Sequence, residues 1–177
     1  MEDWEFERIP ESNATELRFS DCLEKLTNNK YYVGVVGRGV KGIELPLEAT
    51  EYIDFALIRN SKDSQEFLAF IDIIGRECSI NTYADYVVND YKAQFAEKAL
   101  NFRLPTFIIQ EMKKENALLP NRYLWVSAST VLKYPISHDF MSRKNVDNRH
   151  VPLPEWNRRI STFITFIADL PDLSDLF

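Results

Sequence analysis

The sequence predicts an α+β fold: an antiparallel sheet of about four to five strands, mostly from the N-terminal half, covered by about four to five helices. Strand-like alternation of apolar and polar residues clusters early in the chain, and apolar residues at helical spacing dominate later. Hydrophobic residues make up 45% of the 177 residues, which is enough for one core. We therefore expect a single globular domain over 1–177, with a short acidic C-terminal tail at 170–177.

The first elements expected are strands with one short helix between them. Residues 4–9 alternate long or aromatic side chains with Glu, as in a half-buried strand. Ser20 is suited to cap a short helix that ends near 28–29. Further strands, which together would make an antiparallel meander, are expected at 31–36, 43–47 and 52–58.

Four of the five glycines lie in YYVGVVGRGVKGIELP at 31–46, where either a phosphate-binding loop or a hairpin could form. A P-loop ends in Gly-Lys-Ser/Thr, whereas Lys41-Gly42 leads to Ile43. A dinucleotide-binding motif needs a helix directly after the glycines, whereas an alternating stretch with Pro46 follows. The glycines therefore favour a hairpin.

The middle of the chain is expected to be helical. Apolar residues at i, i+3, i+4 and i+7 predict a helix from 63 or 64 to Gly75. Thr82 and Asp85 resemble a capping box for a second helix, and Pro105 would begin a third that ends near 116.

The last third of the chain is expected to hold one strand, one long loop and one helix. Residues 122–128 have the pattern of a strand, and the last helix is expected from about 154 to 170. Between them, 137–153 contains both histidines and no periodicity, which predicts a long loop.

The net charge of −6 arises mainly from the two ends, 1–29 and 169–177. An acidic surface disfavours nucleic-acid binding and favours a basic protein partner. No apolar run approaches the roughly 18 residues of a membrane span, and the N-terminus is acidic, so we expect a cytoplasmic protein without membrane association. Cys22 and Cys78 are expected to be buried thiols, and no cofactor or metal is predicted.

These observations favour a small acidic binding protein that is not an enzyme and acts by stoichiometric association. The hypothesis is a toxin-neutralising immunity protein or antitoxin, whose acidic ends complement the basic cleft of a toxin domain. Aromatic residues near the ends would supply the desolvated contacts. The predicted partner-binding residues are Trp4, Glu5, Glu7, Asp169, Asp172, Asp175 and Phe177.

An enzymatic alternative comes from FIIQEMKK at 107–114. An apolar segment that ends in Glu-x-Lys resembles the PD-(D/E)xK nucleases, although the preceding Pro-Asp is missing. The resemblance implies a metal-dependent nuclease in which Glu111 binds a divalent metal and Lys113 positions or activates the attacking water. An upstream acid, such as Asp85 or Asp90, would be the second metal ligand. The same residues also fit the helix expected from Pro105.

A second alternative comes from the C-terminal sequence DLPDLSDLF, which alternates leucines with aspartates and ends in Phe. It is similar to the acidic tails of bacterial and phage single-strand-binding proteins. The resemblance implies a single-strand nucleic-acid-binding protein whose tail docks on a partner. A tail that folds back on its own domain fits the pattern equally well.

Overall fold

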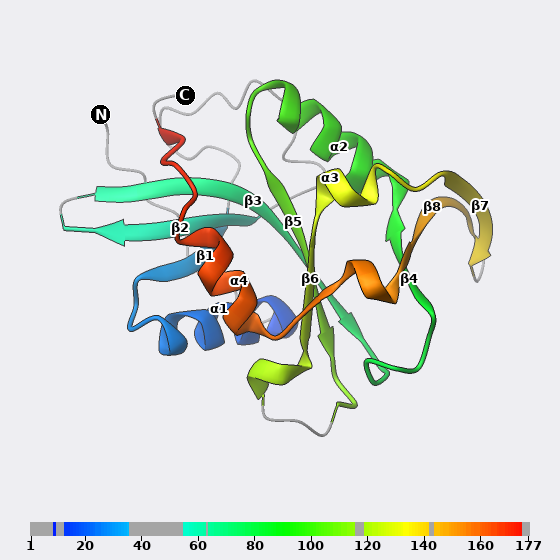
Figure 1. Ribbon diagram of the computed structural model, residues 1–177, viewed down its shortest axis with the longest axis horizontal. Coiled ribbons are helices and arrows are strands. Elements are labelled where there is room, and N and C mark those ends of the chain that lie inside the picture. Colours follow the sequence, from blue (N-terminus) through cyan, green and yellow to red (C-terminus); the bar gives the residue numbers. More distant parts are fainter. Residues whose placement is uncertain are drawn as a thin grey trace.

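The structure is a computed structural model that describes residues 9, 13–35, 55–62, 64–115, 119–141 and 144–174. Within these residues the chain forms strands, α-helices and two short 3-10 helices (Figure 1). In chain order they are α1 (Ala14–Leu26), β1 (Tyr31–Val35), β2 (Phe55–Ser61), β3 (Ser64–Arg76), β4 (Asp85–Asn89), α2 (Asp90–Asn101), β5 (Thr106–Met112), η2 (Leu119–Arg122), β6 (Tyr123–Ser127), α3 (Ala128–Val131), β7 (Ile136–Met141), β8 (Lys144–Pro152), η3 (Leu153–Glu155), β9 (Asn157–Arg158) and α4 (Ile160–Ile167).

Six strands form one mixed sheet in the order β1-β2-β3-β5-β6-β9. β3 and β5 pair in parallel, and all other neighbours in this sheet are antiparallel. A parallel pair needs a crossover connection, and β4 and α2 lie within it. The predicted sheet of four to five antiparallel strands is therefore wrong. The described residues form an α+β structure with a mixed six-stranded sheet, a three-stranded sheet and four α-helices.

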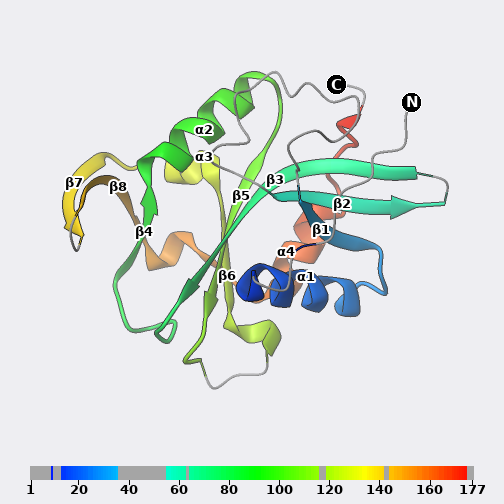
Figure 2. The same ribbon diagram turned by 180° about the vertical axis from the view of Figure 1, so that it is seen from behind.

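The two faces of the large sheet carry different helices. α1 and α4 cover one face, and α2 and α3 cover the other (Figure 1, Figure 2). On the first face Phe19 and Phe163 pack with Phe107 and Trp125 in one apolar cluster. On the other face the apolar side chains form two clusters. One lies around Phe70 of β3 and Phe95 of α2, and the other lies around β5 and β6.

β3 occupies the stretch that was predicted as a helix ending at Gly75. Its residues 67–73 are all buried, because β2 pairs with β3 as far as Ile71, β5 pairs with it from Phe70, and helices cover both faces. A strand buried on both faces is a continuous apolar run, and such a run also contains the i, i+3, i+4 spacing of a helix. The same reason applies to β5, whose seven residues are all buried and which replaces the helix predicted from Pro105.

α1 begins at Ala14, six residues before the predicted cap, so Ser20 lies inside the helix. The Ser20 hydroxyl donates to the Val33 carbonyl (3.3 Å) and accepts from the Val33 N–H (3.1 Å). The Tyr31 N–H donates to Thr27 Oγ1 at 3.2 Å. The side chains of Ser20 in α1 and of Thr27 just after it thus bond to the edge of β1 that pairs with no described strand.

The predicted glycine hairpin falls almost wholly outside the described residues, since 36–54 are not among them. Gly34 is described and lies in β1 opposite Ala56. The strands predicted at 43–47 and over most of 4–9 also lie outside the described residues.

A second sheet of three antiparallel strands, in the order β4-β8-β7, lies beside the first (Figure 1). Two of its strands, β7 and β8, come from the segment predicted as a long loop at 137–153, so that prediction is wrong. The predicted last helix is also shorter than expected, because η3 and β9 precede α4.

The described part of the acidic tail packs on its own domain. The Leu173 N–H donates to the Phe67 carbonyl (2.8 Å), and the Phe67 N–H donates to Ser174 Oγ (3.1 Å). Asp172 Oδ1 accepts from the Ser174 N–H at 2.9 Å. None of the described helices has the length and hydrophobicity that a membrane crossing requires.

Candidate functional site

The large sheet divides in the middle of β3. β2 pairs with β3 only as far as Phe55, whose partner is Ile71, whereas β5 pairs with β3 from Phe70 to Arg76. Within the described residues, β3 beyond Ile71 therefore has a paired strand on its β5 side only. Asp72 is the first residue of this part. Places where the order of strands changes are where open sheets commonly bind ligands.

Asp72 is a buried carboxylate on the face of the sheet that α2 covers. Its two oxygens each lie 2.8 Å from Nζ of Lys92, which projects from the first turn of α2. The side chains are 10% and 14% exposed, so the pair is close to solvent without being open to it. Taking charges out of water is costly unless they are paired, and here the ammonium compensates the carboxylate.

A polar row continues from Asp72 along the same face. Arg76 follows it by four residues on β3, and Gln110 is the partner of Ile74 on β5. Arg76 Nε donates to Gln110 Oε1 (3.0 Å), and its Nη2 donates to the Val87 carbonyl (2.6 Å). Burial lowers the pKa of the Arg76 guanidinium. Gln110 is fully buried, and its Nε2 has no hydrogen-bond partner among the residues that the structure describes.

Glu111, the residue singled out by the Glu-x-Lys pattern, lies on the opposite face of the sheet, toward α1. Its carboxylate is fully buried and accepts from Arg18 Nη2 (2.7 Å), Arg18 Nε (3.0 Å) and the Tyr123 hydroxyl (3.0 Å). The hydrogen bond to Glu111 raises the pKa of Arg18, and burial with the Glu111 charge raises that of Tyr123. Both oxygens of Glu111 are thus engaged by donors.

Lys113 follows β5 and pairs with Glu77, its Nζ 3.2 Å from Oε1. Its side chain crosses Gly75, where a Cβ would lie 2.7 Å from Lys113 Cε and 3.1 Å from Thr15 Oγ1. Glycine at this position therefore permits the close approach of Lys113 and α1 to β3.

The other predicted ligands are engaged elsewhere. Asp85 Oδ1 lies 3.1 Å from His150 Nδ1, and Asp90 Oδ1 accepts from Arg149 Nε at 2.9 Å. The structure does not bring either residue to Glu111. No cluster of three or more His, Cys, Asp or Glu side chains suited to a metal occurs within the described ranges.

Two of the seven predicted partner-binding residues lie within the described part of the chain. Asp169 is exposed after α4, and Asp172 holds Ser174 within the tail. The remainder lie outside the described residues: Trp4, Glu5, Glu7, Asp175 and Phe177.

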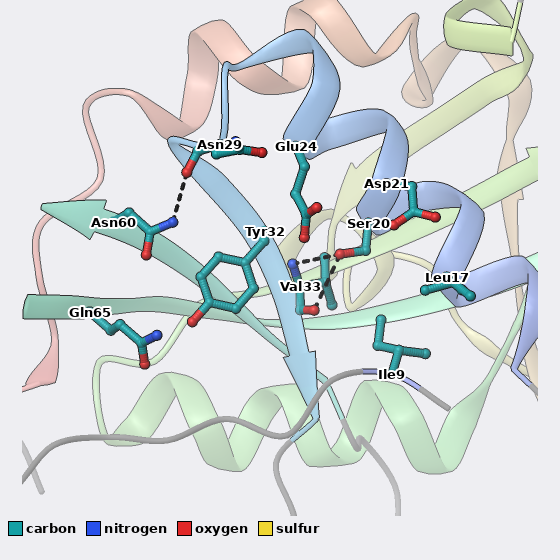
Figure 3. A pocket seen from close by; sticks show the side chains of 10 residues that line it. All are labelled: Ile9, Leu17, Ser20, Asp21, Glu24, Asn29, Tyr32, Val33, Asn60 and Gln65. Atoms are coloured by element: carbon teal, nitrogen blue, oxygen red, sulfur yellow. Dashed lines mark hydrogen bonds between the residues drawn. The ribbon is translucent and has the colours of Figure 1, made fainter. Parts of the chain in front are cut away.

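A pocket of about 530 Å³ lies beside α1 and β1 and extends to the hairpin of β2 and β3 (Figure 3). Its polar lining includes Asp21, Glu24, Tyr32 and Gln65, and among the described residues no Lys, Arg or His lines it. Burial, with the Glu24 charge, raises the pKa of Tyr32 to about 12. Such a lining repels phosphate, and the pocket contains none of the residues of the Asp72 site.

Asp72 and Lys92 were not identified from the sequence. The available signal was a single acid inside the apolar run FLAFIDIIG, because a lone carboxylate in a core strand needs a partner. In the helix predicted for this segment, Asp72 would lie on the solvent face, where its carboxylate needs no protein partner. Lys92 is twenty residues away, and only the crossover brings it to Asp72.

No protein-family model matches the chain, and no curated protein matches its sequence. Among solved structures, a nuclease from a fusselovirus is similar, with a TM-score of 0.51 and 17% sequence identity, covering 92% of this chain and 95% of that chain. A Holliday junction resolvase from Archaeoglobus fulgidus has a TM-score of 0.44 and 10% identity, covering 85% of this chain and 98% of that chain. At these identities the likeness concerns the fold.

The fusselovirus structure contradicts the binding-protein hypothesis. It is named as a nuclease, whereas the sequence favoured a non-enzymatic immunity protein or antitoxin with a basic protein partner and disfavoured nucleic-acid binding. That prediction is wrong because it rested on net charge and on elimination. Net charge bears on association and solubility and does not determine the fold.

Proposed function

We propose that the protein is a metal-dependent nuclease whose active site is built around Asp72 and Lys92. The observation that carries the proposal is the buried Asp72 carboxylate, paired with the Lys92 ammonium where the sheet divides. The fold likeness to a viral nuclease supports the same reaction class. The substrate class is a nucleic-acid phosphodiester.

The residues present suit a magnesium or manganese ion. Such ions are held by one or two carboxylates, with waters and substrate phosphates completing the shell, and Asp72 supplies one carboxylate. A bound ion would supply charge neutralisation at the scissile phosphate and a more acidic water. Lys92 holds three donor hydrogens at Nζ, which can orient a water or a phosphate oxygen next to Asp72.

The decisive experiment compares cleavage of labelled single-stranded, double-stranded and branched DNA, and of RNA, with Mg²⁺ or Mn²⁺. We expect Asp72→Asn to lower the rate by about 100-fold or more, and Lys92→Met by a similar factor. Glu97→Gln, an exposed acid of the same helix, is the matched control and should leave the rate unchanged.

Two outcomes would contradict the proposal. A wild-type chain that cleaves none of these substrates with either metal rejects the nuclease. Full activity in Asp72→Asn rejects this site. The melting temperature gives an independent readout, because a metal that binds the folded state raises it in the wild type and not in Asp72→Asn.

Two further carboxylates belong in the same experiment. Asp54 directly precedes Phe55 in the sequence and lies outside the described residues, so Asp54→Asn tests it without a structural premise. The Glu111 and Lys113 pair remains a prediction, and Glu111→Gln tests it. If Glu111→Gln loses cleavage at unchanged stability, the active site lies at Glu111 and Lys113 and not at Asp72 and Lys92.

A cytoplasmic location also remains a prediction. Cys22 and Cys78 are both free and buried, which suits a reducing compartment. Localisation of a tagged full-length chain tests it directly.

A further inference from the structure

The start of α2 is held by side chains of other elements. The N-cap residue Asn89 makes no side-chain capping hydrogen bond. Asp90, the first residue of the helix, is buried, and Gln94 Nε2 donates to its Oδ2 at 2.6 Å. Lys92 follows two residues later, so whatever fixes Asp90 also fixes the origin of the Lys92 side chain.

Arg149 of β8 is the group that fixes Asp90. Its Nε donates to Asp90 Oδ1 (2.9 Å), while its Nη1 donates to the carbonyls of Tyr134 (2.7 Å) and Leu132 (3.2 Å), just after α3. The Arg149 side chain is 13% exposed and that of Asp90 is 4% exposed. One partly buried guanidinium therefore joins β8, α2 and the segment between α3 and β7.

The backbone makes the same connection. Arg149 is the partner of Val88, and Asn148 is the partner of Asn89, the residue directly before α2. The second sheet thus leads straight into the first turn of α2 (Figure 1). A fork-shaped guanidinium can hold a carboxylate and two carbonyls at once, which a lysine ammonium on a flexible stem cannot reproduce.

We propose that Arg149 is a positioning residue: it fixes the first turn of α2 so that the Lys92 ammonium stays on Asp72. The second sheet then acts as the support of the active-site helix. The inference deepens the proposed nuclease function and rests on it for its catalytic meaning. The positioning itself can be measured without any cleavage.

The first measurement is the labelling rate of lysine amines by an amine-reactive reagent, read residue by residue by mass spectrometry. In Arg149→Met we expect the rate of Lys92 relative to Lys98, an exposed lysine in the last turn of α2, to rise about fivefold. Arg149→Lys should give an intermediate ratio. Arg158→Met, which removes an exposed arginine, is the control and should leave the ratio unchanged.

The second measurement is cleavage. Arg149→Met should lower kcat with little change in KM, and it should have no further effect in a Lys92→Met background. A purely structural role predicts instead an equal loss in both backgrounds.

An unchanged Lys92 to Lys98 ratio in a folded Arg149→Met protein overturns the proposal. If Arg149→Met does not fold, Asp90→Asn replaces it, because it keeps the shape of the side chain and weakens only the charged contact. An unchanged ratio there is equally decisive. A wild type without nuclease activity refutes the proposed function, while the labelling ratio still decides the positioning.

Discussion

Two carboxylates lie inside the same sheet, on opposite faces, and their surroundings differ. Glu111, toward α1, is fully buried and receives three hydrogen bonds from Arg18 and Tyr123. Asp72, toward α2, is slightly exposed and faces the ammonium of Lys92 with both oxygens. Both carboxylates lie in the protein interior, but Glu111 is bound by a guanidinium and a phenol, whereas Asp72 is paired with an ammonium.

The difference is the reason that we place the proposed site at Asp72. A bidentate guanidinium and a phenol hold Glu111 in place, and a new ligand would have to displace well-directed bonds. An ammonium is a point charge with rotatable donors, so Lys92 can stay near Asp72 while a metal or a water enters. The sequence pattern pointed to Glu111, which remains the alternative that the Glu111→Gln variant tests.

The largest expected effect concerns the stability that each cation supplies. Arg18→Met leaves Glu111 buried without a counter-charge, and we expect a loss of about 3–5 kcal/mol in the free energy of unfolding. Lys92→Met should cost less, since Asp72 reaches solvent and Glu111 does not. Urea unfolding at neutral pH measures both.

The double variant Arg18→Met with Glu111→Leu is the control for this prediction. Replacing both partners of a buried pair by apolar residues removes the uncompensated charge, so most of the loss should return. Equal losses in Arg18→Met and Lys92→Met would remove the distinction between the two carboxylates.

A second comparison neutralises each carboxylate without changing its shape. Glu111→Gln should lower stability by about 2 kcal/mol, because the amide cannot accept all three hydrogen bonds and places a donor against Arg18. Asp72→Asn should change stability by about 1 kcal/mol or less while it lowers the cleavage rate by about 100-fold or more. Unfolding and activity assays on the same preparations test this, and the reverse ranking would contradict it.

The phenol of Tyr123 predicts a dependence on alkaline pH. Its pKa is raised in the folded state by burial and by Glu111, so above the ordinary value of 10.0 the unfolded chain releases a proton that the folded chain keeps. Stability therefore falls as pH rises above about 10, by up to about 1.4 kcal/mol per pH unit.

Tyr123→Phe should remove this part of the slope. Tyr83→Phe, at a position that is 60% exposed, is the matched control. The free energy of unfolding between pH 9 and 11 provides the measurement. If Tyr123→Phe and the wild type have the same slope, the pKa of Tyr123 does not differ between the folded and the unfolded state, and the prediction is wrong.

The smallest expected effect concerns the edge of the sheet, away from both carboxylates. Ser20→Ala leaves the N–H and carbonyl of Val33 without their partner, and we expect a loss of about 1 kcal/mol. Cleavage should stay unchanged. Ser161→Ala, at an exposed position of α4, is the control. A loss of cleavage in Ser20→Ala would contradict the prediction, because it would show that the edge of β1 affects the proposed active site.

The sequence predicted the strands β1 and β6 better than the central strands β3 and β5. β1 and β6 were expected at 31–36 and 122–128 and occur at Tyr31–Val35 and Tyr123–Ser127, because short bounded runs of β-branched and aromatic residues favour strands. β3 and β5 were missed because burial on both faces removes the period-2 signal.

The same error hid the candidate site. Read as a helix, FLAFIDIIG places Asp72 on a polar side, and nothing about it is unusual. Read as a central strand, it places a carboxylate in the core, which calls for a partner. Glu111 was found from its tripeptide, but its partner Arg18 comes from a helix 93 residues earlier in the chain, and no local pattern predicts that contact.

The parallel pairing of β3 with β5 also bears on the order in which the chain folds. β2 and β3 meet through a short turn, with Ser61 opposite Ser64, whereas β3 and β5 meet only after the chain has passed through β4 and α2. Contacts between distant parts of a chain form more slowly, because the entropy of closing the intervening loop is lost first. Since Lys92 lies within that crossover, we expect Asp72 to gain its partner in the slowest refolding phase. A nascent or partly unfolded chain would then lack the assembled Asp72 and Lys92 site. Cleavage activity would appear only after the slowest folding phase is complete.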